Sequence, residues 1–137
     1  MSAIYFDRKT PVSTAILAFF ESSNRPVSAK HILAHLNNQH LFPNKTTVYR
    51  ILDKLLAAQA ITEIKIRTGC TYYEKTHGHL HHHFFCMDCE SVFCLAPNHI
   101  DTVIESMKAA NPAFHIHDHD LNLYGRCGSC PSETPAP

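Results

Sequence analysis

Two matched cysteine pairs, Cys86-Met-Asp-Cys89 and Cys127-Gly-Ser-Cys130, constrain the fold of this chain more than any other feature. Each pair presents two thiolates to one ion, and two such pairs complete the closed tetrahedral shell of a structural Zn²⁺ site. Because the pairs are far apart in sequence, a shared ion would tie the first strand of its domain to the C-terminal end. We therefore predict structural zinc here, with a redox-active pair or ordinary buried cysteines as the alternatives.

Two further cysteines stand alone in the sequence, Cys70 and Cys94. A single cysteine is more often a small buried residue than a ligand. We expect this of Cys94, since it lies in an apolar stretch. Cys70 is beside a predicted hairpin turn and stays open as an extra ligand or a redox-active thiol.

The composition suits one domain of ordinary size or two small ones, with 137 residues of which 45% are hydrophobic. No apolar run reaches membrane-spanning length, and no export signal is recognisable at the N-terminus, so we expect a cytoplasmic protein that binds metal rather than forming disulfides. Twelve Lys and Arg balance twelve Asp and Glu. Any contact with nucleic acid must then come from a local basic patch.

The first half of the chain predicts three short helices followed by a hairpin. Thr10-Pro11 and Ser28 are helix starts, and a third helix runs from about Thr46. Its apolar positions recur at helical spacing and are expected in the core: Val48, Ile51, Leu52, Leu55 and Leu56. Alternation around Ile64 and a turn at Thr68-Gly69 then predict two strands. Three helices and a hairpin outline a winged helix, with the third helix as the recognition helix.

The second half changes sharply in composition towards His and Cys after Lys75. We predict short strands around residues 84–85 and 92–93, a helix over 98–110 and a strand over 114–124. The whole is an α+β protein: a winged helix-turn-helix domain at residues 1–75, a small α/β domain at 76–131, and a disordered tail at 132–137.

A histidine-rich segment, Glu74 to His83, predicts a second kind of metal site. In an extended chain His79, His81 and His83 share one face, and Glu74 adds an oxygen. Such a mixed shell suits Zn²⁺, Fe²⁺, Mn²⁺ or Ni²⁺. A second site on the opposite face would use three residues: His82, Asp101 and His119. The alternatives are a solvated polar loop that happens to be His-rich and a chain that picks up metal without specificity.

Four motifs occur in an order that resembles the ferric uptake regulator family of bacterial metalloregulators. They are Asn44-Lys-Thr-Thr-Val-Tyr-Arg-Ile-Leu-Asp-Lys-Leu55, the His-rich run, Cys86-x-x-Cys89, and Leu123-Tyr-Gly-Arg-Cys-Gly-Ser-Cys130. The resemblance covers roughly residues 8 to 130. It implies an N-terminal winged helix, a C-terminal α/β dimerisation domain, a homodimer, and operator DNA binding controlled by metal.

The resemblance also implies roles for individual residues. Tyr49 would contact bases and Arg50 phosphate, while Lys45, Thr46 and Thr47 at the start of the helix suit phosphate contact. The family's hinge sensor matches Glu74, His81 and His83, with His79 the nearest candidate for a fourth ligand. The family's other site matches His82, Asp101 and His119.

Three departures from the family pattern weaken any assignment of metal specificity. Pro26 stands where the family has a further His ligand, so a replacement is needed. His79 is the nearest candidate, with Glu63 or Cys70 as alternatives. Leu80 replaces another expected His, and a basic residue usual early in the first helix is missing.

The resulting hypothesis is a metal-dependent transcriptional repressor of metal-uptake genes that binds operator DNA as a homodimer and is not an enzyme. Zn²⁺ is the structural ion and is favoured as the regulatory ion over Fe²⁺. An iron- or peroxide-responsive regulator of the same family is the alternative. In another class, the rivals are a zinc hydrolase and a metal-buffering protein.

Overall fold

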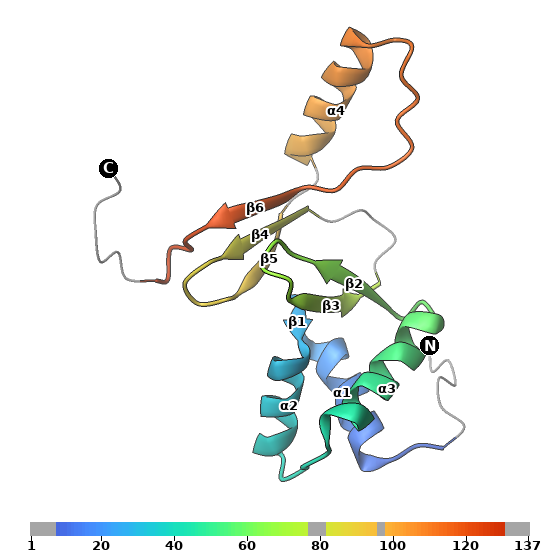
Figure 1. Ribbon diagram of the computed structural model, residues 1–137, viewed down its shortest axis with the longest axis vertical. Coiled ribbons are helices and arrows are strands. Elements are labelled where there is room, and N and C mark those ends of the chain that lie inside the picture. The colour runs from blue at the N-terminus through green and yellow to red at the C-terminus, as the bar shows by residue number, and fades with distance from the viewer. Residues whose placement is uncertain (1–7, 77–81, 96–97, 131–137) are drawn as a thin grey trace. The chain divides into compact units, whose positions relative to one another are not determined.

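The computed structural model describes residues 8–76, 82–95 and 98–130, and it divides into two compact units, Met1–Gly78 and His79–Pro137. Helices and strands follow in the order α1 (Pro11–Ser22), β1 (Val27–Ser28), α2 (Ala29–Asn38), α3 (Lys45–Ala57), β2 (Ile61–Lys65), β3 (Thr71–Lys75), β4 (His82–Cys86), β5 (Val92–Leu95), α4 (Asn98–Ala110) and β6 (Asn122–Gly125) (Figure 1). The predicted α+β class is confirmed. None of the described helices has the length and apolarity to cross a membrane.

The helices of the first unit begin at side chains that satisfy their first backbone N–H groups. Thr10 caps α1 and exchanges hydrogen bonds with Ser13 in a capping box, and Pro11 occupies the first turn. Ser28 caps α2 in the same way, with His31 accepting the Ser28 N–H at Nδ1. Both predicted starts are confirmed. The helix α3 begins one residue before the predicted Thr46, because Asn44 accepts the Thr47 N–H as its N-cap.

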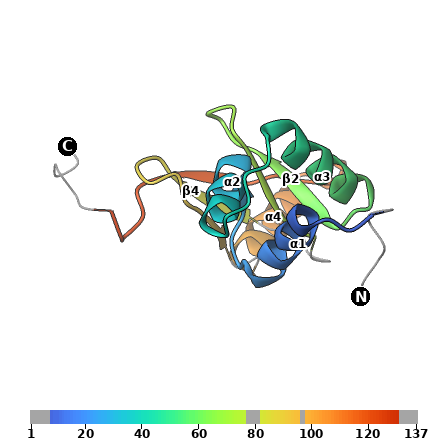
Figure 2. The ribbon, with the colours of Figure 1, turned by 90° about the horizontal axis from the view of Figure 1, so that it is seen from below.

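The core of the first unit lies among α1, α2 and α3, which pack together (Figure 2). Each helix buries one apolar stripe, as the spacing predicted. The fully buried side chains are Ile16, Ile32, Leu36, Val48, Leu52 and Leu55. With the apolar stripe of α3 turned inward, its polar side chains remain on the surface.

A three-stranded antiparallel sheet in the order β1-β3-β2 completes the first unit. The predicted hairpin is β2–β3, and Gly69 in its turn has φ +85°, a backbone conformation that an L side chain rarely adopts. The two-residue strand β1 was not predicted from the sequence. Val27 pairs with Tyr73 and contributes to the core, so β1 links the start of α2 to the hairpin.

The second unit contains a sheet in the order β5-β4-β6. The strands β4 and β5 form an antiparallel hairpin, whereas β6 pairs with β4 in parallel over His83 to Cys86. This register places Cys86 opposite Gly125, two residues before Cys127. The sheet thus brings the two distant cysteine pairs to the same end.

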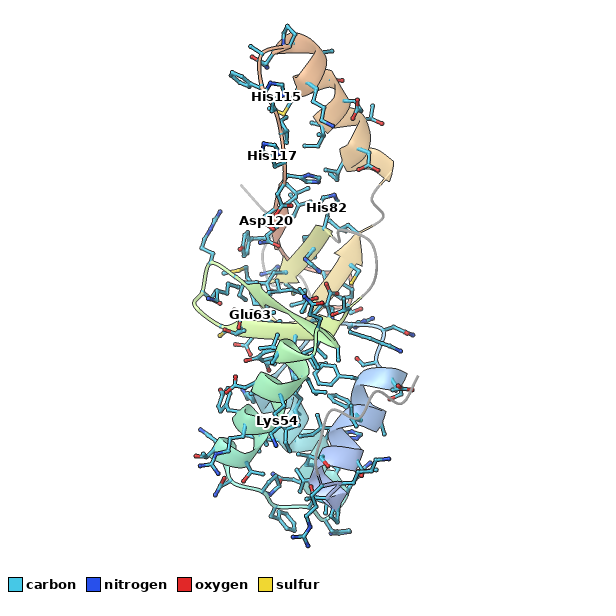
Figure 3. The ribbon with its side chains drawn as sticks, turned by 90° about the vertical axis from the view of Figure 1, so that its right-hand side faces the viewer. Lys54, Glu63, His82, His115, His117 and Asp120 are labelled. Atoms are coloured by element: carbon cyan, nitrogen blue, oxygen red, sulfur yellow. The ribbon has the colours of Figure 1, made fainter. Side chains whose placement is uncertain are left out.

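The predicted strand over residues 114–124 is wrong for most of its length, because β6 spans only Asn122–Gly125. A strand needs a partner for its backbone N–H and C=O groups. The strand β4 is five residues long and pairs with β6 over four of them. His115 and His117 therefore lie along an irregular segment between α4 and β6 (Figure 3).

Replacing Leu52 with Ala tests the proposed dependence of the first unit on its helical core. Leu52 is fully buried, so the substitution should lower the free energy of unfolding by about 2–5 kcal/mol. Chemical denaturation followed by helical circular dichroism measures this loss. Phe42→Ala is the matched control, since Phe42 is 74% exposed and should change stability by no more than about 0.5 kcal/mol. Equal effects from the two substitutions would contradict the core assignment.

Candidate metal centre and nucleic-acid interface

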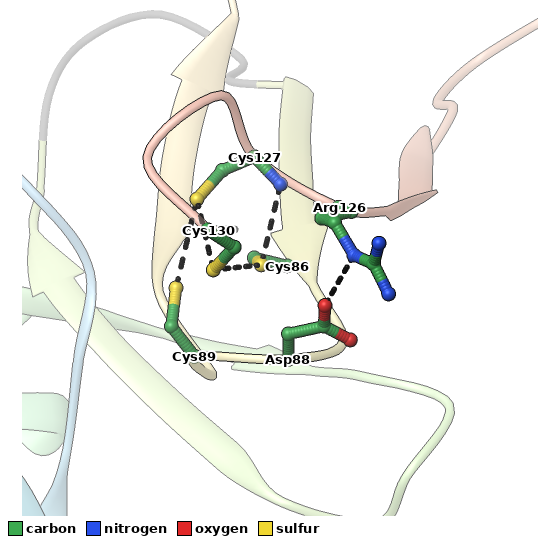
Figure 4. Close-up of polar contacts among 6 residues, drawn as sticks. All are labelled: Cys86, Asp88, Cys89, Arg126, Cys127 and Cys130. Atoms are coloured by element: carbon green, nitrogen blue, oxygen red, sulfur yellow. Dashed lines mark hydrogen bonds and ion pairs between the residues drawn. The ribbon is translucent and has the colours of Figure 1, made fainter. Parts of the chain in front are cut away.

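The four cysteines of the two pairs meet in the second unit. Their sulfur atoms all lie within 4.8 Å of one another. The Sγ atoms of Cys86 and Cys130 are 3.7 Å apart, as are those of Cys89 and Cys127, and those of Cys127 and Cys130 are 3.5 Å apart (Figure 4). The strands β4 and β6 and the turns that follow them position all four.

These distances suit ligands of one ion better than partners in a disulfide. A disulfide would need a separation of about 2.05 Å. Four sulfurs arranged tetrahedrally at about 2.3 Å from Zn²⁺ would be about 3.8 Å apart. The donor set and its spacing therefore fit a closed Cys₄ shell, in which no coordination position is left for a substrate.

Hydrogen bonds shift the pKa values of three of these thiols in different directions. The backbone N–H groups of Cys89 and Cys127 lower the pKa of Cys86 to about 6, and the Cys127 N–H lies 3.3 Å from Cys86 Sγ. Ser91 lowers the pKa of Cys89, mainly through a hydrogen bond from its hydroxyl and also through its backbone N–H. The neighbouring Cys127 sulfur raises the pKa of Cys130 well above its ordinary value. Four thiolates repel one another, and a bound dication offsets that repulsion.

An ion pair also connects the two cysteine pairs, and the sequence analysis missed it. The Nε–H of Arg126 donates to Oδ2 of Asp88 (Figure 4). Asp88 lies inside the first pair, and Arg126 immediately precedes the second. The guanidinium thus sits beside a shell that would carry two negative charges with Zn²⁺ bound. Spacing alone carried no signal for this ion pair, because it depends on how β4 and β6 are paired.

The histidines predicted as regulatory ligands are only partly described. His79 and His81 lie outside the described residues, so their predicted role is untested. His83 is on β4 in the second unit, where it is buried and lies opposite Cys94 in the β4–β5 ladder. Glu74 is on β3 in the first unit and is half-buried.

Two members of the predicted second site are neighbours. The rings of His82 and His119 stack with centroids 5.1 Å apart, and His82 is buried. Their third predicted partner, Asp101, is an exposed residue in the first turn of α4. Within the described part of the chain, Asp101 joins no group of three candidate ligands within 4.8 Å.

Cys94 is exposed, so the expectation that it is buried is wrong. It lies near the end of β5, an edge strand of the second sheet. Cys70 is exposed as well, in the turn that leads into β3.

The residues predicted to contact DNA are grouped at the start of α3. Lys45, Thr46 and Arg50 are exposed, and Tyr49 is 46% exposed. Thr47 is different, because its N–H and its hydroxyl both donate to Asn44 Oδ1 at 2.9 Å. A phosphate at this helix start would therefore compete with the N-cap for the Thr47 N–H.

The zero net charge of the chain conceals two units of opposite sign. Residues 1–78 contain ten Lys and Arg against five Asp and Glu, a formal charge of +5. Residues 79–137 contain two Lys and Arg against seven Asp and Glu, a formal charge of −5. The basic unit is the one that contains α3, as a polyanionic partner requires.

Comparison with known proteins agrees with these features. The model of the ferric uptake regulator family matches residues 7–124. The chain is 31% identical over 119 residues to the ferric uptake regulation protein of Cupriavidus metallidurans, which covers 85% of this chain and 82% of that protein.

Two solved structures share the fold. The crystal structure of the Vibrio cholerae ferric uptake regulator is 25% identical, with a TM-score of 0.74 over 88% of this chain and 92% of that one. A zinc uptake regulator complexed with zinc and DNA is 23% identical, with a TM-score of 0.57 over 90% of this chain and 83% of that one. The resemblance inferred from the motifs is confirmed. The chain belongs to the ferric uptake regulator family, whose members are metal-responsive transcription regulators and not enzymes.

Proposed function

We propose that this protein represses metal-uptake genes by binding operator DNA as a homodimer in the cytoplasm when its sensory metal site is filled. The observation that carries the proposal is the composition of α3. One face of this helix forms the core of a basic unit, while the other exposes Tyr49 and Arg50. A helix with this division has side chains available to the edges of bases in a major groove.

The first unit has the parts that a winged helix requires. The helices α2 and α3 pack together as the helix-turn-helix, and the hairpin β2–β3 is the wing. In this assignment α3 is the recognition helix. Tyr49 contacts bases and Arg50 contacts phosphate, with Lys45, Thr46 and Thr47 contacting phosphates at the start of the helix.

Zn²⁺ is proposed as the structural ion, held by Cys86, Cys89, Cys127 and Cys130. The sulfur spacing and the closed donor set support this assignment. The same closure argues against the zinc hydrolase alternative, because hydrolysis needs an open coordination position. A metal-buffering protein would have no use for the exposed base-contacting residues of α3.

The regulatory ion is proposed to bind Glu74, His79, His81 and His83. Zn²⁺ is favoured because histidine-rich shells suit it, and Fe²⁺ is the alternative. His82, Asp101 and His119 are proposed as a second site, and the stacked rings of His82 and His119 support two of these three. Filling the regulatory site would favour the arrangement of two chains in which both α3 helices match successive half-sites.

A homodimer is supported by apolar side chains of the second unit that stay exposed in one chain. Val103 and Met107 are one helical turn apart on α4, and each is more than half exposed. Phe114 and Leu123 are exposed in the segment beyond α4. Surfaces of this kind commonly mark protein interfaces, and a second copy of the same unit would cover them.

Arg50→Ala tests the proposed DNA face. The exposed guanidinium is removed without a change to the core, so operator affinity should fall on the order of tenfold or more while metal content stays intact. Fluorescence anisotropy with an operator duplex measures the affinity, and elemental analysis measures the metal. Lys108→Ala on α4 is the control for the loss of one positive charge. Unchanged binding by the Arg50 variant would refute the assigned face.

Cys130→Ser tests the structural ion. The variant lacks one of four thiolates, so it should lose about one zinc per chain and the thermal stability of the second unit. Elemental analysis and circular dichroism measure these losses. Cys70→Ser should keep the ion of the Cys₄ shell, because Cys70 lies outside it. If the Cys130 variant kept as much zinc as the wild type, the assignment of a structural ion to these four cysteines would be contradicted.

A further inference from the structure

Two surface hollows of the first unit border α3 on different flanks. Successive residues of an α-helix are about 100° apart around its axis. Lys45 and Tyr49 therefore occupy one flank of α3, and Arg50 and Lys54 occupy the other. Each pair lines a separate hollow, and the exposed surface of α3 lies between them.

The first of these, the α2 hollow, lies between α2 and α3 and has a volume of about 430 Å³. Its lining consists of Ala29, Lys30, Leu33, Ala34, Asn37, Lys45 and Tyr49. Lys30 and Lys45 are exposed ammonium groups, and Asn37 and Tyr49 add neutral hydrogen-bond donors. No carboxylate is part of this lining.

The second, the α1 hollow, lies between the start of α1 and α3 and has a volume of about 320 Å³. Its lining consists of Arg8, Thr10, Ser13, Thr47, Arg50, Ile51, Asp53 and Lys54. Arg8, Arg50 and Lys54 bring three positive charges from two separate segments, and Figure 3 labels Lys54 on α3. Asp53 is its one acidic member.

We propose that the two hollows seat backbone phosphates on the two walls of the major groove that α3 enters. This inference rests on the proposed binding of operator DNA by α3. A helix with its side chains is about 10–12 Å across and the groove is about 12 Å wide, so each flank of the helix meets one phosphate-lined wall. Lys30 binds phosphate in the α2 hollow, and Arg8 and Lys54 bind it in the α1 hollow.

These phosphate contacts would position α3 without distinguishing one base sequence from another. They add Arg8, Lys30 and Lys54 to the phosphate contacts proposed at the start of α3, and they lie on both flanks of that helix. Arg8 also supplies a positive charge ahead of α1, whose own sequence has no basic residue. Asp53 repels a phosphate in the α1 hollow, so its carboxylate limits affinity for DNA of any sequence.

The salt dependence of binding tests the proposal, because each basic side chain that neutralises a phosphate releases counterions. Lys30→Gln, Lys54→Gln and Asp53→Asn are compared with the wild type and with Lys108→Gln as the charge control. All are full-length, metal-loaded proteins. The probes are a duplex selected by the wild type from a randomised pool and a scrambled duplex of the same composition. Affinities are measured over a series of salt concentrations, and circular dichroism checks that each variant is folded.

Each of the two lysine variants should reduce the slope of log affinity against log salt by about 0.9 for every phosphate that it no longer neutralises. The affinity for each of the two duplexes should fall by the same factor, so the ratio of the two affinities is unchanged. Asp53→Asn should strengthen binding to both, and Lys108→Gln should match the wild type. Slopes that stay at the wild-type value in both lysine variants would overturn this inference alone. A wild type that binds neither duplex would overturn the proposed function, and this inference with it.

Discussion

The second unit depends on the meeting of four sulfur atoms at the end of the β4–β6 pair. Among its described residues, only Phe85, Cys86 and Val92 are buried and hydrophobic, and the main core cluster lies entirely in the first unit. A domain this small rarely gains enough stability from its core alone and uses a metal, disulfides or a partner chain instead. The four clustered thiols could hold such a metal, and the exposed side chains on α4 are an apolar surface that a partner chain would cover.

The first unit has the opposite construction. Its three helices bury a continuous core, so it can present charged and aromatic groups on its surface without losing its shape. The same helix serves both purposes, because Val48 and Leu52 face inward while Tyr49 and Arg50 stay accessible. The separation of charge, +5 in residues 1–78 and −5 in residues 79–137, gives each unit a different kind of partner. The basic unit suits DNA, and the acidic, histidine-rich unit suits cations.

Local signals in the sequence predicted most of the fold. Thr10, Ser28 and the apolar stripe of α3 act within a few residues of the structure they determine, and spacing alone grouped the four cysteines. Long-range pairing was the weak point. The residues 114–121 alternate as a strand does but form no strand in the structure. The strand β1 is too short for a periodic signal, and Cys94 is exposed although it lies in an apolar stretch. The Arg126–Asp88 pair and the two hollows beside α3 likewise depend on tertiary structure that spacing does not encode.

Metal-dependent DNA binding is the central claim, and a titration tests it most directly. Protein that retains the Cys₄ ion but lacks the regulatory ion is mixed with an operator duplex at fixed salt. Zn²⁺, Fe²⁺ and Mn²⁺ are then added separately at buffered concentrations. The account predicts weak binding at first and a large gain in affinity with one metal, Zn²⁺ being favoured. A gain with Fe²⁺ alone would still support metal-dependent DNA binding, with iron in place of zinc as the regulatory ion. Affinity that is the same with every metal and with none would contradict the account.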